Sequence, residues 1–265
     1  MTPATFKRSI RDLQVWCSSC MVAFQGSDPI AVLIGAKRPS GTLIHKIAVH
    51  PDHCRQGHGR HLLTSLSSKL AILGPPRMVA EVPETFAAVV ALFDACAYVH
   101  ESILTDYVLD GQDEKGLALS EHESGKAGLM RVEGFVIPVT VDDLAANGLL
   151  GEADAQVCWE RSVETLTARK DDIAGLAVAS DERIEAYLLY VERGVAGAEI
   201  LSLRSFVEDD GARLTQLLFQ LRARGTTTFW FPKVHPAEIK KEFLETLGFR
   251  PAGGHRLYAA KARSN

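Results

Sequence analysis

The chain has 265 residues, of which 46% are hydrophobic and 23% are charged, and its formal net charge at pH 7 is −4. This length allows two domains with separate cores, and the composition is that of an ordinary soluble protein. The slightly acidic balance excludes a global basic field, so nucleic acid is not expected as a partner, and no apolar run reaches the roughly 20 residues of a membrane-spanning helix.

Hydrophobic periodicity divides the first half of the chain into strands and helices. The expected elements, in chain order, are a helix over 4–16, strands over 21–24, 29–36 and 42–49, a helix with its apolar face formed by Leu62, Leu63, Leu66, Leu70 and Leu73, a strand over 77–82, a helix over 85–97 and a strand over 100–109. A polar, glycine-bearing stretch over 111–130 then predicts a linker. The first domain is therefore expected to span 1–110.

The five cysteines are an odd number at irregular spacing, which predicts reduced thiols and a cytoplasmic location. The run Cys17-Ser-Ser-Cys20 has the spacing of redox and zinc motifs, but no second cysteine pair completes a zinc site. We expect no metal site, and side chains that face solvent or phosphate, at the loop histidines His50, His53, His58 and His61.

A basic loop, Arg55-Gln56-Gly57-His58-Gly59-Arg60, connects the third strand to the leucine-rich helix. A helix that starts just after two glycines presents unpaired N–H groups and partial positive charge to such a loop. The glycines let a phosphate approach the backbone closely, and the two arginines add full charges. An ordinary strand-to-helix turn is the alternative, but the absence of acids from Arg55 to Arg60 favours an anion site.

The same stretch resembles motif A of the GCN5-related N-acetyltransferases, the GNAT superfamily, which has the loop pattern Q/R-x-x-G-x-G/A. Gly57 and Gly59 match its glycines, whereas Cys54 stands where glutamine or arginine is usual. Residues 78–98 are similar, without a gap, to the next strand–helix unit of ribosomal-protein alanine acetyltransferases. The resemblance implies an α/β fold with a mixed sheet and acetyl-CoA as the cofactor. It implies that the pyrophosphate lies on residues 55–60 and that the pantetheine pairs with the main chain of Ile47, Ala48 and Val49.

The second half repeats this order in degenerate form, which indicates two tandem copies of the fold and a second domain over 131–265. Its expected elements are strands over 132–139, 173–179, 185–192, 198–206, 226–231 and 256–260 and helices over 141–150, 156–170, 212–224 and 239–249. In place of the basic loop it has Glu208-Asp209-Asp210-Gly211, and these carboxylates would repel a pyrophosphate. We therefore expect the cofactor in the first half only. The second half shapes the acceptor cleft, holds a dimer or acts as a structural brace.

The resemblance also implies the chemistry, which is direct attack of a primary amine on the acetyl-CoA thioester in a ternary complex. Glu81 aligns with the glutamate that serves ribosomal-protein acetyltransferases as the base. His45, on the neighbouring strand, and Glu84 are the alternatives. Such a base removes the proton that the amine must lose.

The family's usual general acid is a tyrosine that protonates the departing thiolate, and Phe93 stands at its position. General acid help is typically worth 10²- to 10⁴-fold, so its loss weakens the case for catalysis. Tyr98 and Tyr107 are the candidates to replace it.

The leading interpretation is an acetyl-CoA-dependent N-acetyltransferase acting on a primary amine, which could be a small molecule, a protein N-terminus or a lysine. The alternative is a non-catalytic acyl-CoA-binding or protein-interaction module of the same fold. Members of the family begin with one more strand and helix than this chain predicts. Because an exposed sheet edge is a liability, we expect the second domain or a homodimer partner to cover it.

Overall fold

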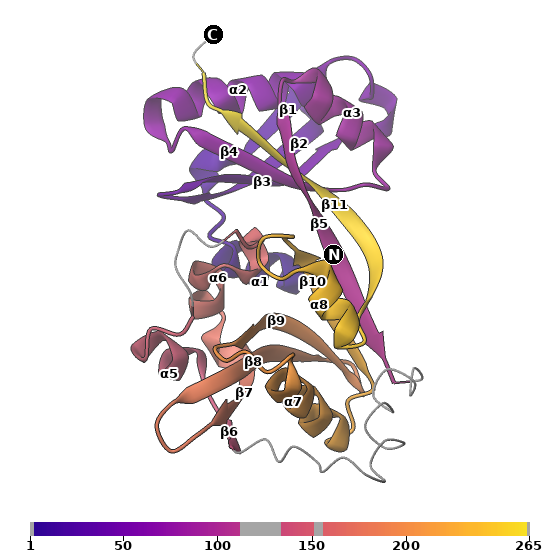
Figure 1. Ribbon diagram of the computed structural model, residues 1–265. Helices are drawn as coiled ribbons and strands as arrows, with labels where there is room; N and C mark the ends of the chain where they lie inside the picture. Colours follow the sequence, from indigo (N-terminus) through magenta and orange to yellow (C-terminus); the bar gives the residue numbers. More distant parts are fainter. Residues whose placement is uncertain (1–2, 112–133, 151–155, 264–265) are drawn as a thin grey trace. The chain divides into compact units, whose positions relative to one another are not determined.

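The computed structural model describes residues 3–111, 134–150 and 156–263 (Figure 1). They divide into two compact units, one made of Met1–Leu104 with Gly254–Asn265 and the other of Thr105–Gly253. The predicted linker over 111–130 lies outside the described residues, apart from Gly111. Among the helices in these ranges, none is both long enough and apolar enough to cross a membrane.

The first unit is a mixed sheet with α2 and α3 on one face (Figure 1). Its elements are α1 (Pro3–Asp12), β1 (Met21–Gln25), β2 (Asp28–Arg38), β3 (Gly41–Val49), α2 (His58–Leu73), β4 (Arg77–Pro83), α3 (Ala87–Ala95), the first part of β5 (Val99–Asp110) and the last part of β11 (Arg250–Lys261). The strand order is β1-β2-β3-β4-β11-β5. The β3–β4 pair is parallel, whereas β1–β2, β2–β3 and β4–β11 are antiparallel. This mixed sheet confirms the predicted fold class.

The apolar face of α2 forms much of this unit's core. Leu62, Leu63, Leu66 and Leu70 are buried, as their helical spacing predicts, and they pack in one cluster with the inward-facing residues of β4. Leu73, which the same pattern assigned to the buried face, is 68% exposed. The reason is that α2 ends at this residue, and Leu73 lies at the surface beside Lys37 and Arg38 of β2 instead of in the core.

We expect two leucine-to-alanine changes on α2 to differ sharply in their effect on stability. Leu66→Ala should lower the free energy of unfolding by about 3 kcal/mol, because Leu66 is fully buried and a cavity remains. Leu73→Ala, on the same helix, should change it by less than about 0.5 kcal/mol. Urea denaturation followed by circular dichroism measures both, and equal losses would contradict this placement of the helix.

The C-terminal strand completes the sheet of the first unit. β11 pairs with β4, so that Tyr258 lies opposite Ala80. In the second unit β5, from the first half of the sequence, pairs with β10 and places Tyr107 opposite Phe231. The bounds expected from the sequence assigned all of 131–265 to the second domain. The units differ from them, because each exchanges a strand with the other half of the sequence.

The second unit repeats this architecture. Its strand order is β5-β10-β9-β8-β7-β6. Its elements are β6 (Phe135–Pro138), α5 (Val141–Ala146), α6 (Val163–Ala168), β7 (Ala174–Ala179), β8 (Ile184–Arg193), β9 (Gly197–Ser205), α7 (Ala212–Ala223), β10 (Thr228–Val234) and α8 (Lys241–Thr246). The long helix predicted over 156–170 is instead a 3₁₀ turn, Trp159–Arg161, followed by α6. Ser162 separates the two, because its side chain accepts from the backbone N–H of Thr165 and starts a new helix.

β1 is the last strand at one edge of the first unit's sheet, and no described strand pairs with its outer side. On the face of the sheet away from α2, Val22 and Phe24 of this strand are 49% and 60% exposed. The expectation that a homodimer partner covers this edge therefore stays a prediction. Static light scattering showing a monomer over the micromolar range would contradict it.

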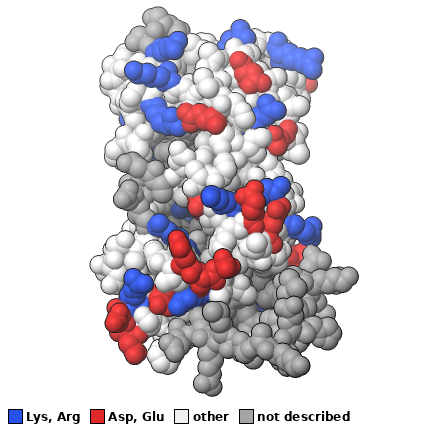
Figure 2. All heavy atoms as spheres, viewed as in Figure 1, with Lys and Arg blue, Asp and Glu red and all other residues white. Residues whose placement is uncertain are grey.

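Charged side chains of both signs are interspersed on the face of the molecule that Figure 2 displays. Ion pairs such as Arg77–Glu101, at 2.6 Å, and Lys170–Asp142, at 2.7 Å, join neighbours of opposite charge. This pattern agrees with the absence of a global basic field, so the positive charge near the start of α2 is a local feature.

Candidate active site

The N-terminus of α2 is open. Gly57 is its N-cap in the left-handed region, with φ 89°, and neither a capping side chain nor an acidic residue occupies the first turn. The first intrahelical hydrogen bond runs from the N–H of His61 to the carbonyl of Gly57, at 2.9 Å. The N–H groups before His61 therefore point out of the helix, where the helix dipole adds positive charge.

A pocket of about 640 Å³ lies at this helix end. Its lining residues are Ile47, Ala48, Val49, His53, Cys54, Arg55, Gly57, His58, Gly59, Arg60, Ala88, Val89 and Leu92. The structure thus brings together all the cofactor residues predicted from the sequence except Gln56, whose side-chain amide donates to the carbonyl of Asp52 at 3.1 Å. The residues from α3, at 88, 89 and 92, were missed because no local pattern shows which helix faces the loop.

The strand β3 presents unpaired main chain beside this pocket. It pairs with β2 along its length, but the described register with β4 covers only Thr42 and Leu43. The N–H of His50 donates to Ile30 of β2, at 2.7 Å. Because alternate residues of an antiparallel strand point to opposite sides, the N–H and C=O groups of Ile47 and Val49 point away from β2. An extended ligand can pair with them there.

The glycines and the loop conformation fit a bound pyrophosphate. A Cβ on Gly57 would have no atom within 4 Å, so open space lies in front of the helix. A Cβ on Gly59 would lie 3.0 Å from Leu92 of α3, which leaves room for backbone only. Arg55 adopts φ 60°, an uncommon left-handed conformation that bends the loop around the helix end. These residues therefore suit an anion that is held by backbone donors and two arginines.

The corresponding helix end in the second unit is filled. Gly211, the N-cap of α7, has φ 84°, like Gly57. The carboxylate of Asp209 accepts from the N–H groups of Gly211, at 3.1 Å, and Arg213, at 2.9 Å. Phe243 and Leu247 lie within 3.2 Å of where a Gly211 Cβ would be. A protein carboxylate thus occupies the donors that a phosphate would need.

Asp209→Ala should destabilise the second unit without changing acetyl-CoA binding. It removes the acceptor for two helix N–H groups and one partner of Arg213, which then keeps only Glu185, at 2.6 Å. A loss of about 1–2 kcal/mol is expected, as for other helix caps. The matched control is Glu208→Ala, an exposed neighbour, and a weakened acetyl-CoA affinity in Asp209→Ala alone would contradict the assignment of the cofactor to the first unit.

The candidate bases do not line the pocket. Glu81 is half-buried on β4, opposite Leu257 of β11, and its side chain is on the other face of the sheet from Ala80. His45 is the extra residue of a bulge between β2 and β3, and bulges re-aim side chains. Glu84 is exposed and its carboxylate lies 3.7 Å from Arg256 Nε. The structure therefore leaves all three as candidates.

The candidate general acids are in the core. Tyr98 is 7% exposed and donates to the sulfur of Met78, at 3.7 Å, and burial raises the pKa of its hydroxyl. Tyr107 belongs to the second unit's core. Phe93 stacks on Tyr258, a residue that the sequence did not suggest, whose hydroxyl donates to Asp94 at 2.7 Å. Burial, and next the bond to Asp94, raise the pKa of Tyr258. None of these tyrosines is among the residues that line the pocket.

The histidines near the loop do not form a metal site. Ring centroids of His50 and His53 lie 5.8 Å apart, and those of His53 and His58 lie 6.1 Å apart. In the part of the chain that the structure describes, no group of three or more His, Cys, Asp or Glu side chains is arranged to hold a metal ion.

Comparison with known proteins finds a similar family model and similar solved structures. The sequence model of the Acetyltransferase (GNAT) family matches residues 3–98. A similar solved structure is a tandem GNAT protein from the clavulanic acid biosynthesis pathway, at 16% identity and TM-score 0.64, with 97% of this chain and 88% of that chain covered. Another is a GCN5-related N-acetyltransferase from Sphaerobacter thermophilus, at 13% identity and TM-score 0.59, with 90% and 78% covered. No curated protein sequence matches the chain.

The ribosomal-protein-S18-alanine N-acetyltransferase from Escherichia coli also matches, at 27% identity over 40% of this chain and 65% of that chain, but the TM-score of 0.35 supports no structural argument. At these identities the solved structures that match most of the chain show the fold alone, and the family model matches only residues 3–98. The chain therefore has the fold of tandem GNAT proteins, and its residues 3–98 are similar to the acetyltransferase domain of the GNAT family.

Proposed function

We propose that the chain transfers an acetyl group from acetyl-CoA to a primary amine, and that the first unit carries the active site. The observation that carries this proposal is the pocket that joins the open N-terminus of α2 to the unpaired edge of β3. The helix N-terminus suits a pyrophosphate, and the strand edge suits an extended chain that carries amide groups. A coenzyme A molecule has both of these groups. The filled helix end of α7 supports a single cofactor site.

Each pocket element has a role in this proposal. Arg55, Arg60 and the first-turn N–H groups bind the pyrophosphate. The main chain of Ile47 to Val49 pairs with the pantetheine, and one of its N–H groups polarises the thioester carbonyl. Acetyl-CoA supplies the acetyl group in activated form, so the protein's remaining task is to orient the amine and accept its proton.

Glu81 is the proposed base, with His45 and Glu84 as alternatives. A thiol with an ordinary pKa of about 8.5 is a tolerable leaving group without protein help. The burial of Tyr98 and Tyr258 therefore does not exclude turnover. The acceptor is a primary amine of a small molecule, or of a protein N-terminus or lysine.

A second function has a specific observation in its favour. Phe93 is packed in the core at the position of the family's usual acid, and no tyrosine lines the pocket. A non-catalytic acyl-CoA-binding or protein-interaction module needs no such acid. Cofactor binding without acetyl transfer to any amine in a broad panel would select this alternative.

The first test is calorimetry with acetyl-CoA on the parent chain and on Gly59→Glu. We expect micromolar binding by the parent and none by the variant, because a side chain at this buried glycine collides with Leu92, which also lines the pocket, and adds negative charge there. An amine panel with Glu81→Gln as the comparison then tests turnover. A parent chain that does not bind acetyl-CoA would overturn both the enzyme and the cofactor-binding module.

A further inference from the structure

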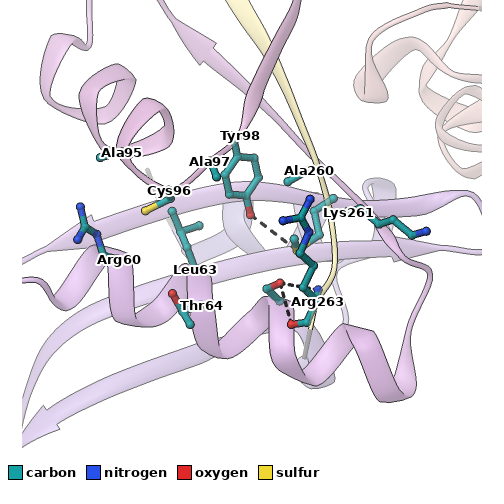
Figure 3. A pocket seen from close by; sticks show the side chains of 12 residues that line it. Arg60, Leu63, Thr64, Ala95, Cys96, Ala97, Tyr98, Ala260, Lys261 and Arg263 are labelled. Atoms are coloured by element: carbon teal, nitrogen blue, oxygen red, sulfur yellow. Dashed lines mark hydrogen bonds between the residues drawn. The ribbon is translucent and has the colours of Figure 1, made fainter. Parts of the chain in front are cut away.

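The first unit has a second pocket, of about 290 Å³, between α2, the turn after α3 and the end of β11 (Figure 3). Figure 3 shows that Arg60 and Lys261 of its lining point away from each other. Ala260 packs against the core on the α2 side of the sheet, so its neighbour Lys261 belongs to the opposite face. These two cations therefore do not converge on one ligand, whereas the polar groups of a pocket in the second unit do.

This second-unit pocket has a volume of about 200 Å³ and lies where α6, β9 and the chain after β10 meet. Its walls are partly apolar and include Leu166 and Leu201, which belong to a buried hydrophobic cluster of the same unit. Its charged lining residues are Arg161, Arg204 and Glu238. Apolar walls with a few polar groups are typical of a small-molecule site, and this volume suits a small ligand.

Two of the three charges cancel each other. The side chain of Arg161 is 1% exposed, and its two terminal nitrogens each donate to one carboxylate oxygen of Glu238 at 2.6 Å. The same guanidinium donates to the carbonyl of Lys233 in β10 at 3.0 Å and lies 3.4 Å from the carbonyl of Leu201 in β9. This ion pair is therefore fixed between the strands, and Arg204 supplies the one charge of the pocket that it leaves uncancelled.

Arg204 has no carboxylate partner among the residues that the structure describes. It lies on β9 directly opposite Tyr187 of β8, and its side chain is exposed. Its Nη1 atom lies 3.5 Å from the carbonyl of Leu149, which is at the limit of a hydrogen bond. Most of the five donors of this guanidinium are therefore available to a ligand.

A pair of hydroxyl groups stands beside Arg204. Tyr187 Oη and Ser202 Oγ share a hydrogen bond at 3.1 Å, and Ser202 lines the pocket. Burial raises the pKa of Tyr187, whereas Ser202 and Arg204 act in the opposite direction, and the phenol keeps its proton at neutral pH. Two hydroxyls carry two protons, of which their shared bond uses one. In the described part of the chain neither hydroxyl donates to any other acceptor, so one donor remains to be satisfied.

We propose that the second-unit pocket binds a small monocarboxylate that carries a short apolar chain. Its carboxylate accepts from the guanidinium of Arg204 and from the hydroxyl of Ser202, which itself accepts from Tyr187. One negative charge matches the one uncancelled positive charge. The apolar chain contacts Leu166 and Leu201.

A primary amine is the competing ligand, because Glu238 also lines the pocket. Both oxygens of this carboxylate already accept from Arg161, and the side chain of Glu238 is only 14% exposed. An ammonium group would have to displace that buried arginine and would also meet the positive charge of Arg204. The pocket therefore selects against cations. It lies in the second unit, so this site does not depend on acetyl-CoA binding by the first.

The test is a ligand titration of the full chain, followed by nuclear magnetic resonance, with butanoate, hexanoate and benzoate as probes. The primary amide and the primary amine of each carbon skeleton are the comparison compounds. We expect each carboxylate that fits to bind the parent at least tenfold more tightly than its amide, because a charge-assisted bond to Arg204 is lost in the amide.

Three variants locate the bound carboxylate. Arg204→Gln removes the charge from an exposed side chain and should weaken carboxylate binding at least tenfold while leaving amide binding unchanged. Ser202→Ala removes only the hydroxyl and should weaken it by a smaller factor. Arg183→Gln, at an exposed residue of the turn between β7 and β8, is the matched control and should bind as the parent does. Circular dichroism checks that each variant is folded.

Three outcomes would overturn the carboxylate site. They are a parent chain that binds none of the carboxylates, an Arg204→Gln variant that binds them as tightly as the parent, and amines that bind more tightly than the matching carboxylates. Because no probe contains coenzyme A, a failure of the proposed acetyl transfer would leave these results unchanged. Failure of the carboxylate site would likewise leave the acetyl-CoA titration as it is.

Discussion

Arg60→Glu is expected to remove acetyl-CoA binding while leaving the fold intact or slightly more stable. Arg60 is in the first turn of α2, where a negative side chain interacts favourably with the helix dipole by about 0.3–1 kcal/mol. The same glutamate replaces attraction of the pyrophosphate by repulsion. The lost attraction and the added repulsion together should weaken the free energy of binding by about 3 kcal/mol, which corresponds to at least 100-fold weaker binding. Calorimetry should therefore show a lower affinity for acetyl-CoA, whereas thermal unfolding should show an equal or higher melting temperature.

Two comparisons make this result specific. Lys69→Glu makes the same change of charge on α2 at a residue that lines neither pocket, and should bind acetyl-CoA as the parent does. Arg60→Gln, which removes the charge without reversing it, should give an intermediate affinity. Parent-like binding by Arg60→Glu would show that the pyrophosphate does not lie at this helix end.

Arg161→Met is expected to be among the most destabilising single changes in the second unit. The side chain of Arg161 is 1% exposed, and its guanidinium makes two hydrogen bonds of 2.6 Å to the carboxylate of Glu238. It also donates to the carbonyl of Lys233 at 3.0 Å and lies 4.6 Å from the ring centroid of Phe231. Removing one partner of such a buried pair leaves an uncompensated charge, which costs about 3–5 kcal/mol.

A double-mutant cycle tests this account. Glu238→Leu alone should cost a similar amount, whereas Arg161→Met combined with Glu238→Leu should recover a large part of the loss, because no unpaired charge remains. An exposed ion pair, Lys241 with Glu245 at 3.6 Å, is the control, and Lys241→Ala should cost less than about 0.5 kcal/mol. Strictly additive losses in the double variant would contradict a coupled pair.

Local pattern was sufficient to predict most of the elements and the loop and strand residues that line the pocket at the start of α2. The two glycines and two arginines define the start of α2, and period-3.6 leucines define its buried face. Both are properties of a short stretch of chain. The mixed sheet and the duplication followed in the same way, from the order of elements and from the resemblance in motif A.

Features that depend on distant residues could not be predicted. Asp209 caps α7, whereas from the sequence it was expected only to repel a pyrophosphate. The contact of α3 with the loop, the bond of Tyr258 to Asp94 and the position of Glu81 outside the pocket all depend on tertiary packing. Strand pairing is equally non-local, because alternation shows that Arg250–Lys261 is a strand but not that β4 is its partner.

The position of β11 in the first unit has a consequence for how the protein is made. The ribosome releases β1 to β4 long before it releases the strand that pairs with β4, and 164 residues separate Tyr258 from its partner Asp94. Until β11 has been made, β4 has an unpaired edge and Phe93 lacks its stacking partner. Contacts of such high sequence separation slow folding, and they make completion of the first unit the last step of folding rather than the first.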